Sequence, residues 1–314
     1  MSVVRAVVVD PDIPGGARMG EIPAPRPQPH QALVEVHHVA LNHGDLLTGA
    51  RPAGTVLGGD ASGVVVQVAA DGSGPAAGTR VAALIAGAWA ERLAVDTANL
   101  GVIPPAADPA HAAALPVAGL SALRALRAGG PILGKRVLVN GASGGVGRMA
   151  VQLAVLGGAH VIASVRSADR AEGPARLGAH QVVVGLDGVG APVDLVLDNL
   201  GGPHLVAAWN LLAPGGNIQG IGWASGEPAV LPPYATWAPG AAKTLSSFGD
   251  DSPTATDLGT LLGLLAEGRL SPEIDWRGPW HRFADAMRAL SERRIAGKAV
   301  LDVKDLSPSH AGAG

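Results

Sequence analysis

Apolar residues in the first hundred positions fall into short segments that glycine and proline separate. Segments rich in valine and other β-branched residues cover positions 3–9, 32–39, 62–68 and 79–85. Several such segments in succession, each bounded by turn residues, indicate an all-β or barrel-like module. Residues 23–29 contain four prolines and are predicted to form an extended loop, because proline fixes φ and lacks a backbone N–H.

The pattern changes near residue 109, where continuous apolar strands begin to alternate with helical segments. Fully apolar strands connected by helices indicate a parallel sheet that is covered on both faces. Right-handed crossovers make such a sheet doubly wound. The predicted helices cover residues 110–128, 146–156, 168–177 and 204–212, and the predicted strands cover 136–140, 160–165, 181–184, 193–198 and 217–221.

The C-terminal part of the chain follows neither pattern. Apolar residues at helical spacing predict amphipathic helices over 257–267 and 282–293. A short apolar segment at 297–303 is predicted to be a closing strand that returns to the N-terminal β-rich module, and residues 307–314 are expected to be frayed. The sequence therefore predicts an α/β protein with one β-rich and one doubly wound domain.

Composition and charge exclude several classes of protein. The 314 residues, 47% of them hydrophobic, are enough for two domains with a buried core. The chain has no cysteine, which excludes disulfides, thiolate nucleophiles and cysteine-containing zinc or iron–sulfur sites. A net charge of −3 and an aromatic content of 3% argue against a nucleic-acid partner.

Membrane insertion and export are not indicated either. The apolar stretches are far shorter than the roughly 20 residues that a membrane span needs. The first ten residues lack a cationic segment and a small-residue cleavage site. We therefore expect a cytoplasmic protein without a membrane partner.

A glycine-rich loop follows the predicted strand 136–140 and opens the predicted helix 146–156. In this context, glycines let backbone N–H groups approach a pyrophosphate at the positive end of a helix, as in dinucleotide-binding folds. The spacing differs from the strict fingerprint because position 142 is alanine. Glycine turns also join strands to helices for packing alone. The interpretation as a dinucleotide-binding loop therefore depends on the alternating strands and helices that surround it. The predicted cofactor-binding residues of the loop are Gly141, Ala142, Ser143, Gly144, Gly145, Val146 and Gly147.

The end of the next predicted strand indicates which dinucleotide is bound. Proteins that bind NAD place an acidic residue about 20 residues further on, where it holds the ribose 2′-hydroxyl. Here hydroxyl and guanidinium groups follow the strand, and these donors suit a 2′-phosphate. Asp169 fits a helix cap better, so the sequence favours NADPH; alternatively, the arginines are solvated residues at a helix start. The predicted ligands are Ser164, Arg166, Ser167 and Arg170.

Further motifs extend over nearly the whole chain. They read ALNHGD at 40–45, LGGDASG at 57–63, GAWAE at 87–91, LPVAGLSA at 115–122, DNLGG at 198–202, LAPGG at 212–216 and GK at 297–298. With the glycine-rich loop, the chain resembles the medium-chain dehydrogenase/reductase superfamily, specifically its zinc-free quinone oxidoreductase (zeta-crystallin-like) and enoyl reductase branch. The resemblance implies a GroES-like catalytic domain at 1–110 and 268–314, a Rossmann domain that binds NADPH at 111–267, and a homodimer.

The resemblance also implies roles for single residues. Asn42 and Asp45 would line the cleft between nicotinamide and substrate, although both could instead only hold a loop through backbone hydrogen bonds. The candidates for a side-chain proton donor are His43 and Tyr234, which lies in a proline-rich segment that is expected to form a substrate-facing lid. Outside the loop, the residues implied to contact the cofactor are Ser121, Asn199, Gly222, Trp223 and Lys298.

Zinc is not expected. Zinc alcohol dehydrogenases of this superfamily need a thiolate near position 42 and a Gly-His-Glu around 58–60, where this chain carries Asn42 and Gly58-Gly59-Asp60. The resemblance implies metal-free hydride transfer from NADPH to a quinone or an α,β-unsaturated carbonyl, with hydrogen-bond donors stabilising the charge on oxygen. The alternatives are an enoyl reductase acting on a polyketide-like intermediate, a weakly catalytic NADPH-binding redox sensor and, against the ligand positions, a zinc alcohol dehydrogenase.

Overall fold

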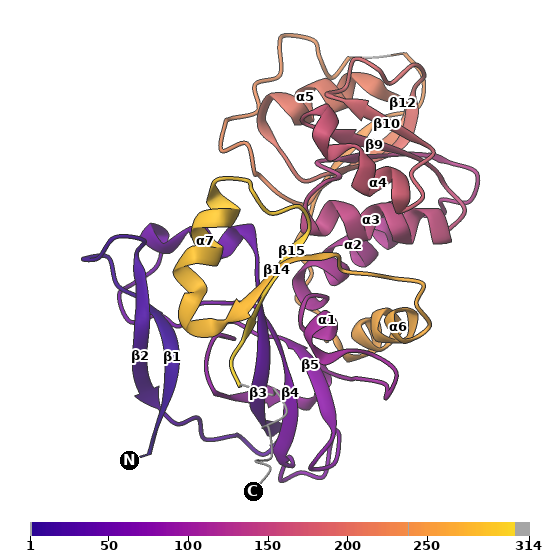
Figure 1. Cartoon of the computed structure of the whole chain (residues 1–314). Coiled ribbons are helices and arrows are strands. Elements are labelled where there is room, and N and C mark those ends of the chain that lie inside the picture. The colour runs from indigo at the N-terminus through magenta and orange to yellow at the C-terminus, as the bar shows by residue number, and fades with distance from the viewer. Residues whose placement is uncertain (1, 238, 305–314) are drawn as a thin grey trace, which may run out of the picture.

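The β-branched segments of the N-terminal part form a sheet that the C-terminal part completes. Its strands are β3 (Gln31–Leu41), β4 (Asp60–Gln67), β5 (Arg80–Leu84), β6 (Arg92–Asp96), β7 (Leu100–Val102), β14 (Ile274–Pro279) and β15 (Lys298–Asp302). In the computed structural model, which describes residues 2–237 and 239–304, they are ordered β14-β15-β3-β4-β5-β7, with β6 paired to β3. Figure 1 shows the C-terminal strands β14 and β15, in yellow, beside the N-terminal strands of this sheet. β15 pairs antiparallel with β3, which confirms the predicted return of the closing strand.

A hairpin of β1 (Val3–Val9) and β2 (Ala17–Pro23) packs beside this sheet. Single β-bridges from Ala6 to Ala90 and from Val8 to Val56 attach it to the rest of the domain. Apolar side chains of the hairpin, the sheet and the helix α7 (Phe283–Ser291) form one core, which includes the fully buried Trp89.

Six parallel strands form the second sheet of the described chain. They are β8 (Arg136–Asn140), β9 (His160–Val165), β10 (Gln181–Val184), β11 (Val193–Asp198), β12 (Leu212–Gly220) and β13 (Thr244–Ser247). Their order, β10-β9-β8-β11-β12-β13, reverses direction beside β8, as in doubly wound nucleotide-binding folds. Val137 and Val139 of β8 face one hydrophobic core and Leu138 faces another, so the sheet is covered on both sides. The predicted fold class is confirmed.

The helices differ from the prediction mainly at their ends. They are α1 (Pro109–Ala113), α2 (Pro116–Ala128), α3 (Gly145–Leu156), α4 (Glu172–Arg176), α5 (Gly202–Leu211), α6 (Ala255–Ala266) and α7. The predicted helix 110–128 is two helices, because Pro116 lacks an N–H and restricts the residue before it. The predicted helix 168–177 is a 3-10 turn, Ala168–Arg170, followed by α4, and Leu212 starts a strand instead of ending a helix.

Five strands were not predicted: β2, β6, β7, β13 and β14. Each is short or lies at an edge, and none contains more than three consecutive apolar residues. The pairing of such strands depends on the neighbouring strand, which a local pattern does not contain. Within residues 2–237 and 239–304, none of the helices has the length and apolar character to cross a bilayer. The predicted frayed segment 307–314 lies outside the described residues.

Candidate active site

The glycine-rich loop forms the turn between β8 and α3. Gly141 has a φ of +77°, which the absence of a Cβ permits. A Cβ on Gly147 would lie 2.3 Å from the Gly141 carbonyl oxygen, so this glycine lets the start of α3 pack against the turn. At Gly144, an added Cβ would meet only that same carbonyl oxygen, at 3.7 Å, among the atoms that the structure describes. Gly144 therefore faces open space.

The N-terminus of α3 is suited to bind an anion. Gly144 is its N-cap, and no side chain of the described residues caps the helix through a hydrogen bond. The first N–H groups of a helix lack intrahelical acceptors and carry the positive end of the helix dipole. These donors, together with the space in front of Gly144, fit the pyrophosphate of a dinucleotide.

A buried ammonium group lies next to this loop. Lys298 begins β15, and its Cδ would lie 2.8 Å from a Cβ placed on Gly145. Its Nζ donates hydrogen bonds to the Leu41 carbonyl oxygen at 2.9 Å, to Oδ1 of Asn42 at 2.7 Å and to Oδ2 of Asp60 at 3.0 Å. An ammonium has three N–H donors. All three are used inside the protein, so only the hydrocarbon stem of Lys298 is left to contact a cofactor in this arrangement.

Asp60 completes what we call the Lys298 cluster, which consists of Lys298, Asn42 and Asp60. Oδ2 of Asp60 also accepts from Nδ2 of Asn42 at 2.9 Å, and Oδ1 accepts from the backbone N–H of Val117 at 2.6 Å. Val117 lies in the first turn of α2, so Asp60 satisfies one N–H of a helix start. From the sequence, Asp60 was noted only as the residue at a zinc-ligand position. The signal for its role was an acid inside the apolar motif LGGDASG.

Asn42 is held at several of its atoms. Its Oδ1 accepts from Lys298, and its Nδ2 donates to Asp60. Its backbone N–H donates to Oδ2 of Asp45 at 2.8 Å, within the short 3-10 helix His43–Leu46. An amide has two N–H donors, and Nδ2 has only Asp60 as an acceptor among the described residues. The second amide hydrogen of Asn42 therefore remains available to a ligand.

Asp45 is buried and has an altered ionisation. Burial raises the pKa of its carboxyl to about 6, a shift that the hydrogen bond from the Asn42 backbone opposes and the nearby charge of Asp60 increases. Asp45 was expected either to line the cleft or only to hold the loop through a backbone hydrogen bond, and that hydrogen bond is present. The same position also gives a carboxyl group that changes protonation near neutral pH.

The predicted 2′-phosphate ligands lie in different surroundings. Ser164 is buried, and its hydroxyl donates to the Gly185 carbonyl oxygen at 2.8 Å. This hydroxyl is bonded within the protein, just beyond the end of β10, and the role of Ser164 as a cofactor ligand stays a prediction. Ser167 is half-buried and precedes the 3-10 turn after β9.

Arg166 and Arg170 converge on one backbone oxygen of the other domain. Both guanidinium groups donate to the carbonyl of Arg293, at 3.4 Å from Arg166 and 2.6 Å from Arg170. Arg293 follows α7 and has a φ of +56°. The structure thus brings the two predicted arginines together and aims them at an acceptor.

Three of the remaining predicted cofactor contacts lie where β11 and β12 end. Nδ2 of Asn199 donates to the Asn140 carbonyl oxygen at 2.9 Å, and a Cβ on Gly222 would lie 2.9 Å from the Asn199 carbonyl oxygen. The ring of Trp223 covers Gly201, where an added Cβ would lie 2.4 Å from it. Ser121 is half-buried on α2.

The two candidate proton donors are exposed. His43 directly follows Asn42. Tyr234 lies in the segment between β12 and β13, which is attached to α5 by a hydrogen bond from Nε1 of Trp209 to the Ala235 carbonyl oxygen at 2.8 Å. This hydrogen bond places the segment beside α5, and the role of Tyr234 as a catalytic acid stays a prediction.

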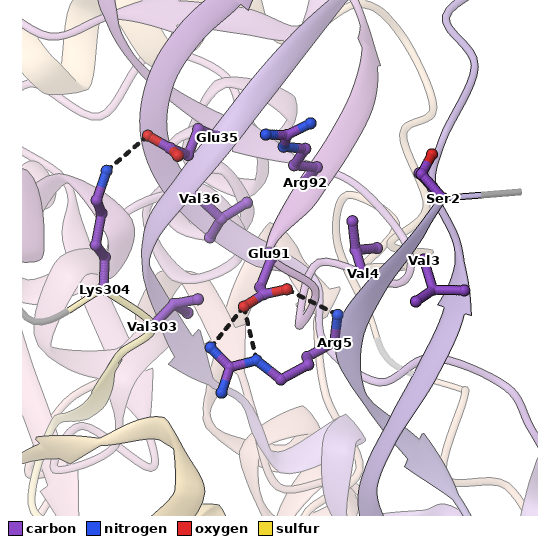
Figure 2. Close-up of a pocket in the computed structure, with 11 residues that line it drawn as sticks. Ser2, Val3, Val4, Arg5, Glu35, Val36, Glu91, Arg92, Val303 and Lys304 are labelled. Atoms are coloured by element: carbon purple, nitrogen blue, oxygen red, sulfur yellow. Dashed lines mark hydrogen bonds and ion pairs between the residues drawn. The ribbon is translucent and has the colours of Figure 1, made fainter.

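A cavity of about 440 Å³ lies elsewhere, lined by residues of β1, the middle of β3 and the start of β6, together with Val303 and Lys304 (Figure 2). Two ion pairs line it, Arg5 with Glu91 at 2.6 Å and Lys304 with Glu35 at 2.8 Å (Figure 2). Its lining includes none of the predicted site residues. It is therefore separate from the glycine-rich loop.

Comparison with known proteins agrees with this geometry. The family model of the alcohol dehydrogenase GroES-like domain matches residues 28–105, and that of the zinc-binding dehydrogenases matches residues 156–301. The spectinabilin polyketide synthase system protein NorB of Streptomyces orinoci is 33% identical over 289 residues, which cover 87% of this chain and 13% of NorB. The human synaptic vesicle membrane protein VAT-1 homolog is 29% identical over 314 residues, covering 88% of this chain and 80% of that protein.

The solved structure of the quinone oxidoreductase from Coxiella burnetii has the same fold, with a TM-score of 0.84, 24% identity and coverage of 96% of this chain and 100% of that one. The chain belongs to the medium-chain dehydrogenase/reductase family of oxidoreductases. The fold and its relatives imply a nicotinamide cofactor. The chain spans only 8–13% of the first three polyketide synthase relatives.

Proposed function

We propose that this protein is a metal-free, NADPH-dependent reductase that transfers a hydride to a quinone or an α,β-unsaturated carbonyl compound. The observation that carries the proposal is the buried Lys298, whose hydrocarbon stem packs against the glycine-rich loop and whose ammonium binds both Asn42 and Asp60. A protein cation thereby orients an amide donor beside the open N-terminus of α3. This arrangement can polarise an acceptor oxygen without a metal ion.

The residues of the site do not fit zinc, although one matching family is described as zinc-binding. Zinc sites use several His, Cys, Asp or Glu ligands. In the described part of the chain, no group of three or more such side chains is placed to hold a metal ion. Asp60, the acid at the zinc-ligand position, uses one oxygen for Lys298 and Asn42 and the other for Val117.

The protein would stabilise the charge that develops on the acceptor oxygen. When bound, the reduced nicotinamide supplies the hydride from its C4 atom. Asn42 offers one fixed amide N–H, and a donor held in place before the reaction requires no reorganisation during it. Lys298 binds the oxygen of the same amide and so polarises that N–H.

Asp45 would serve as the nearby proton source. Its pKa of about 6 keeps part of the population protonated near neutral pH. It lies beside Asn42, to which it is bound through the backbone N–H. His43, exposed on the same short helix, is the second candidate for this step.

Two arginines support NADPH as the cofactor. Arg166 and Arg170 share the Arg293 carbonyl oxygen. A phosphate offers several charged acceptor oxygens and binds guanidinium groups more strongly than a neutral carbonyl does. The 2′-phosphate would replace this carbonyl as the acceptor.

The similarity to NorB favours a second acceptor class. Polyketide synthesis passes through enzyme-bound thioesters, and an α,β-unsaturated thioester presents the same conjugated carbonyl as an enone. The same Asn42 donor would serve both acceptors.

We also propose a homodimer in which β13 pairs with its copy. β13 ends the parallel sheet, and its outer edge pairs with no strand in the described residues. The preceding segment exposes Tyr234 and Trp237, with 87% and 78% of their surface accessible. An exposed strand edge next to an apolar patch favours association with another chain, and a two-fold axis would place identical edges together.

The test is to measure NADPH and NADH oxidation with a panel of quinones, an enone, an enoyl thioester and a saturated ketone, each with and without a chelator. Chelator-resistant turnover of NADPH with a quinone or a conjugated carbonyl supports the proposal. Chelator-sensitive oxidation of an alcohol would overturn it. Tight NADPH binding without turnover of any acceptor would favour the redox-sensing alternative.

A further inference from the structure

The segment that connects α6 to β14 ends with Glu273, which has an unfavourable backbone conformation. Glu273 has a φ of +52°, in the left-handed region that side chains other than glycine rarely adopt. Gly297 packs directly on it, because a Cβ at position 297 would lie 2.3 Å from the Glu273 carbonyl oxygen. That carbonyl accepts the backbone N–H of Lys298 at 3.0 Å. The backbone of Glu273 thus fixes the start of β15, from which the Lys298 side chain enters its cluster.

The carboxylate of Glu273 reaches the Rossmann domain. Its Oε2 accepts from Nη1 of Arg148 at 3.0 Å, and Arg176 of α4 binds both of its oxygens. The Arg148 side chain is only 8% exposed, whereas that of Arg176 is 58% exposed. Nε of Arg148 also donates to the Ser143 carbonyl oxygen at 3.2 Å. Arg148 therefore connects Glu273 to the glycine-rich loop.

Arg148 depends on this partner. It lies in the first turn of α3, where the helix dipole disfavours a cation. A buried charge is also costly unless it is paired. Glu273 compensates both effects and keeps the guanidinium against Ser143. Without the carboxylate, Arg148 would move toward solvent and release the loop carbonyl.

We infer that Glu273 is a positioning residue that holds the cofactor loop and the Lys298 cluster in one fixed relation. This inference rests on the proposed function, because it assigns the loop to the cofactor and the cluster to the acceptor. One residue contacts both sides: its carbonyl binds the backbone of Lys298, and its carboxylate binds the arginine that holds Ser143. Loss of the carboxylate would shift the loop relative to Asn42. The competing explanation is a salt bridge that only ties two domains together.

The test compares Glu273→Gly and Glu273→Gln with the unchanged protein. Glycine keeps the left-handed backbone and removes the carboxylate, whereas glutamine keeps the length and removes the charge. We expect about tenfold weaker binding of NADPH and of NADH, by the same factor, read from nicotinamide fluorescence. We expect kcat to fall about 10- to 100-fold, with little change in the KM of the acceptor.

Two further variants separate positioning from general stability. Arg176→Ala removes only the exposed partner and should change affinity by less than about threefold. Glu267→Gln removes an exposed carboxylate that pairs with Arg269 and serves as the control. The melting temperature of every variant is measured in parallel. If Glu273→Gly does not fold, Glu273→Gln with Glu273→Asp as its conservative rescue gives the same comparison.

Unchanged cofactor affinity and kcat in the Glu273 variants would overturn the inference, whatever their melting temperature. A loss confined to NADPH would also overturn it, since the effect would then pass through the 2′-phosphate. The proposed function can fail separately: if no acceptor is reduced, or if NADH binds better than NADPH, fluorescence titration still measures the Glu273 effect. If neither reduced cofactor binds, both proposals fall.

Discussion

Nζ of Lys298 lies 3.0 Å from Oδ2 of Asp60, and the two side chains are 2% and 0% exposed. The residues are 238 positions apart in the chain and lie on β15 and β4, so the pair connects the C-terminal part of the sheet to its N-terminal part. A buried ion pair is tolerated only when its remaining donors and acceptors are satisfied. The Leu41 carbonyl, Asn42 and the Val117 N–H meet this condition. The pair that links β15 to β4 across β3 therefore also orients Asn42.

Replacing Lys298 by methionine should lower the free energy of unfolding by about 3–5 kcal/mol, because it leaves the Asp60 carboxylate buried without a cation. Urea unfolding at neutral pH measures the change. Lys304→Met is the matched control: Lys304 pairs with Glu35 on the surface, so its loss should cost less than about 1 kcal/mol. Equal losses for the two variants would mean that Lys298 is not the cation that Asp60 requires.

The raised pKa of Asp45 predicts a specific dependence of stability on pH. The carboxyl titrates near its ordinary value of 3.8 in the unfolded chain and at about 6 in the folded protein. Between these values the folded state binds more protons, so Asp45 makes the free energy of unfolding fall as pH rises from about 4 to about 6.

Asp45→Asn removes this dependence. The unfolding free energy of the unchanged protein minus that of the variant should therefore decrease by about 2 kcal/mol between about pH 4 and about pH 7. Urea unfolding of both proteins across this range provides the measurement. A difference that stays constant, or that grows with pH, would contradict the assignment of the titration to Asp45.

Two glycines of the loop should respond differently to the same substitution. Gly144→Val extends into open space and should leave the melting temperature nearly unchanged, but it fills the room needed by a pyrophosphate and should abolish cofactor binding. Gly147→Val places a Cβ against the Gly141 carbonyl oxygen. This overpacking should lower the free energy of unfolding by about 1–3 kcal/mol and the melting temperature by several degrees. Retained cofactor binding in Gly144→Val would mean that the loop is only a packing turn.

Arg166→Ala and Arg170→Ala should each weaken NADPH binding by about 1.5–3 kcal/mol, the contribution of a hydrogen bond to a charged group. Binding of NADH should be nearly unaffected, because it lacks the 2′-phosphate. Isothermal titration with both cofactors gives the comparison, and Arg269→Ala, on an exposed surface pair, is the control. Equal weakening for NADPH and NADH would reject the 2′-phosphate assignment.

The proposed dimer predicts that a charge on the edge strand separates the two copies. Leu245 lies on β13 with about half of its surface exposed, so Leu245→Lys should disfavour edge pairing at little cost to the fold. Light scattering after size exclusion measures the mass, and Leu133→Lys, at another exposed position, is the control. A monomer before any substitution, or a dimer that persists in Leu245→Lys, would rule out this interface.

Much of the fold could be predicted because its signals are local. The apolar segments of β8, β9 and β11, separated by helices, indicate a parallel sheet by themselves. The break at Pro116 was missed although its signal is local, because the apolar pattern continues across it. The edge strands β13 and β14 could not be found in the same way, because their pairing depends on β12 and β15 and not on their own composition.

The site was predicted in part. The motifs singled out Asn42, Asp45 and Lys298, which the structure brings together. The Ser164 hydroxyl, expected at the cofactor, donates to the Gly185 carbonyl oxygen. The roles of Asp60, Arg148 and Glu273 were missed, since each depends on a partner more than 50 positions away. Spacing along the chain gives no information on such pairs.

The sequence by itself determined the alternation of buried strands and helices in the parallel sheet, the absence of thiolate ligands, and a glycine-rich turn between a strand and a helix. These features depend on side-chain type and short-range spacing. Only the tertiary structure decided that the Lys298 ammonium binds Asn42 and Asp60, and that Glu273 joins this cluster to the loop through Arg148. Folding brings these distant charges into a space with little water, where each must be paired, and that requirement fixes their arrangement.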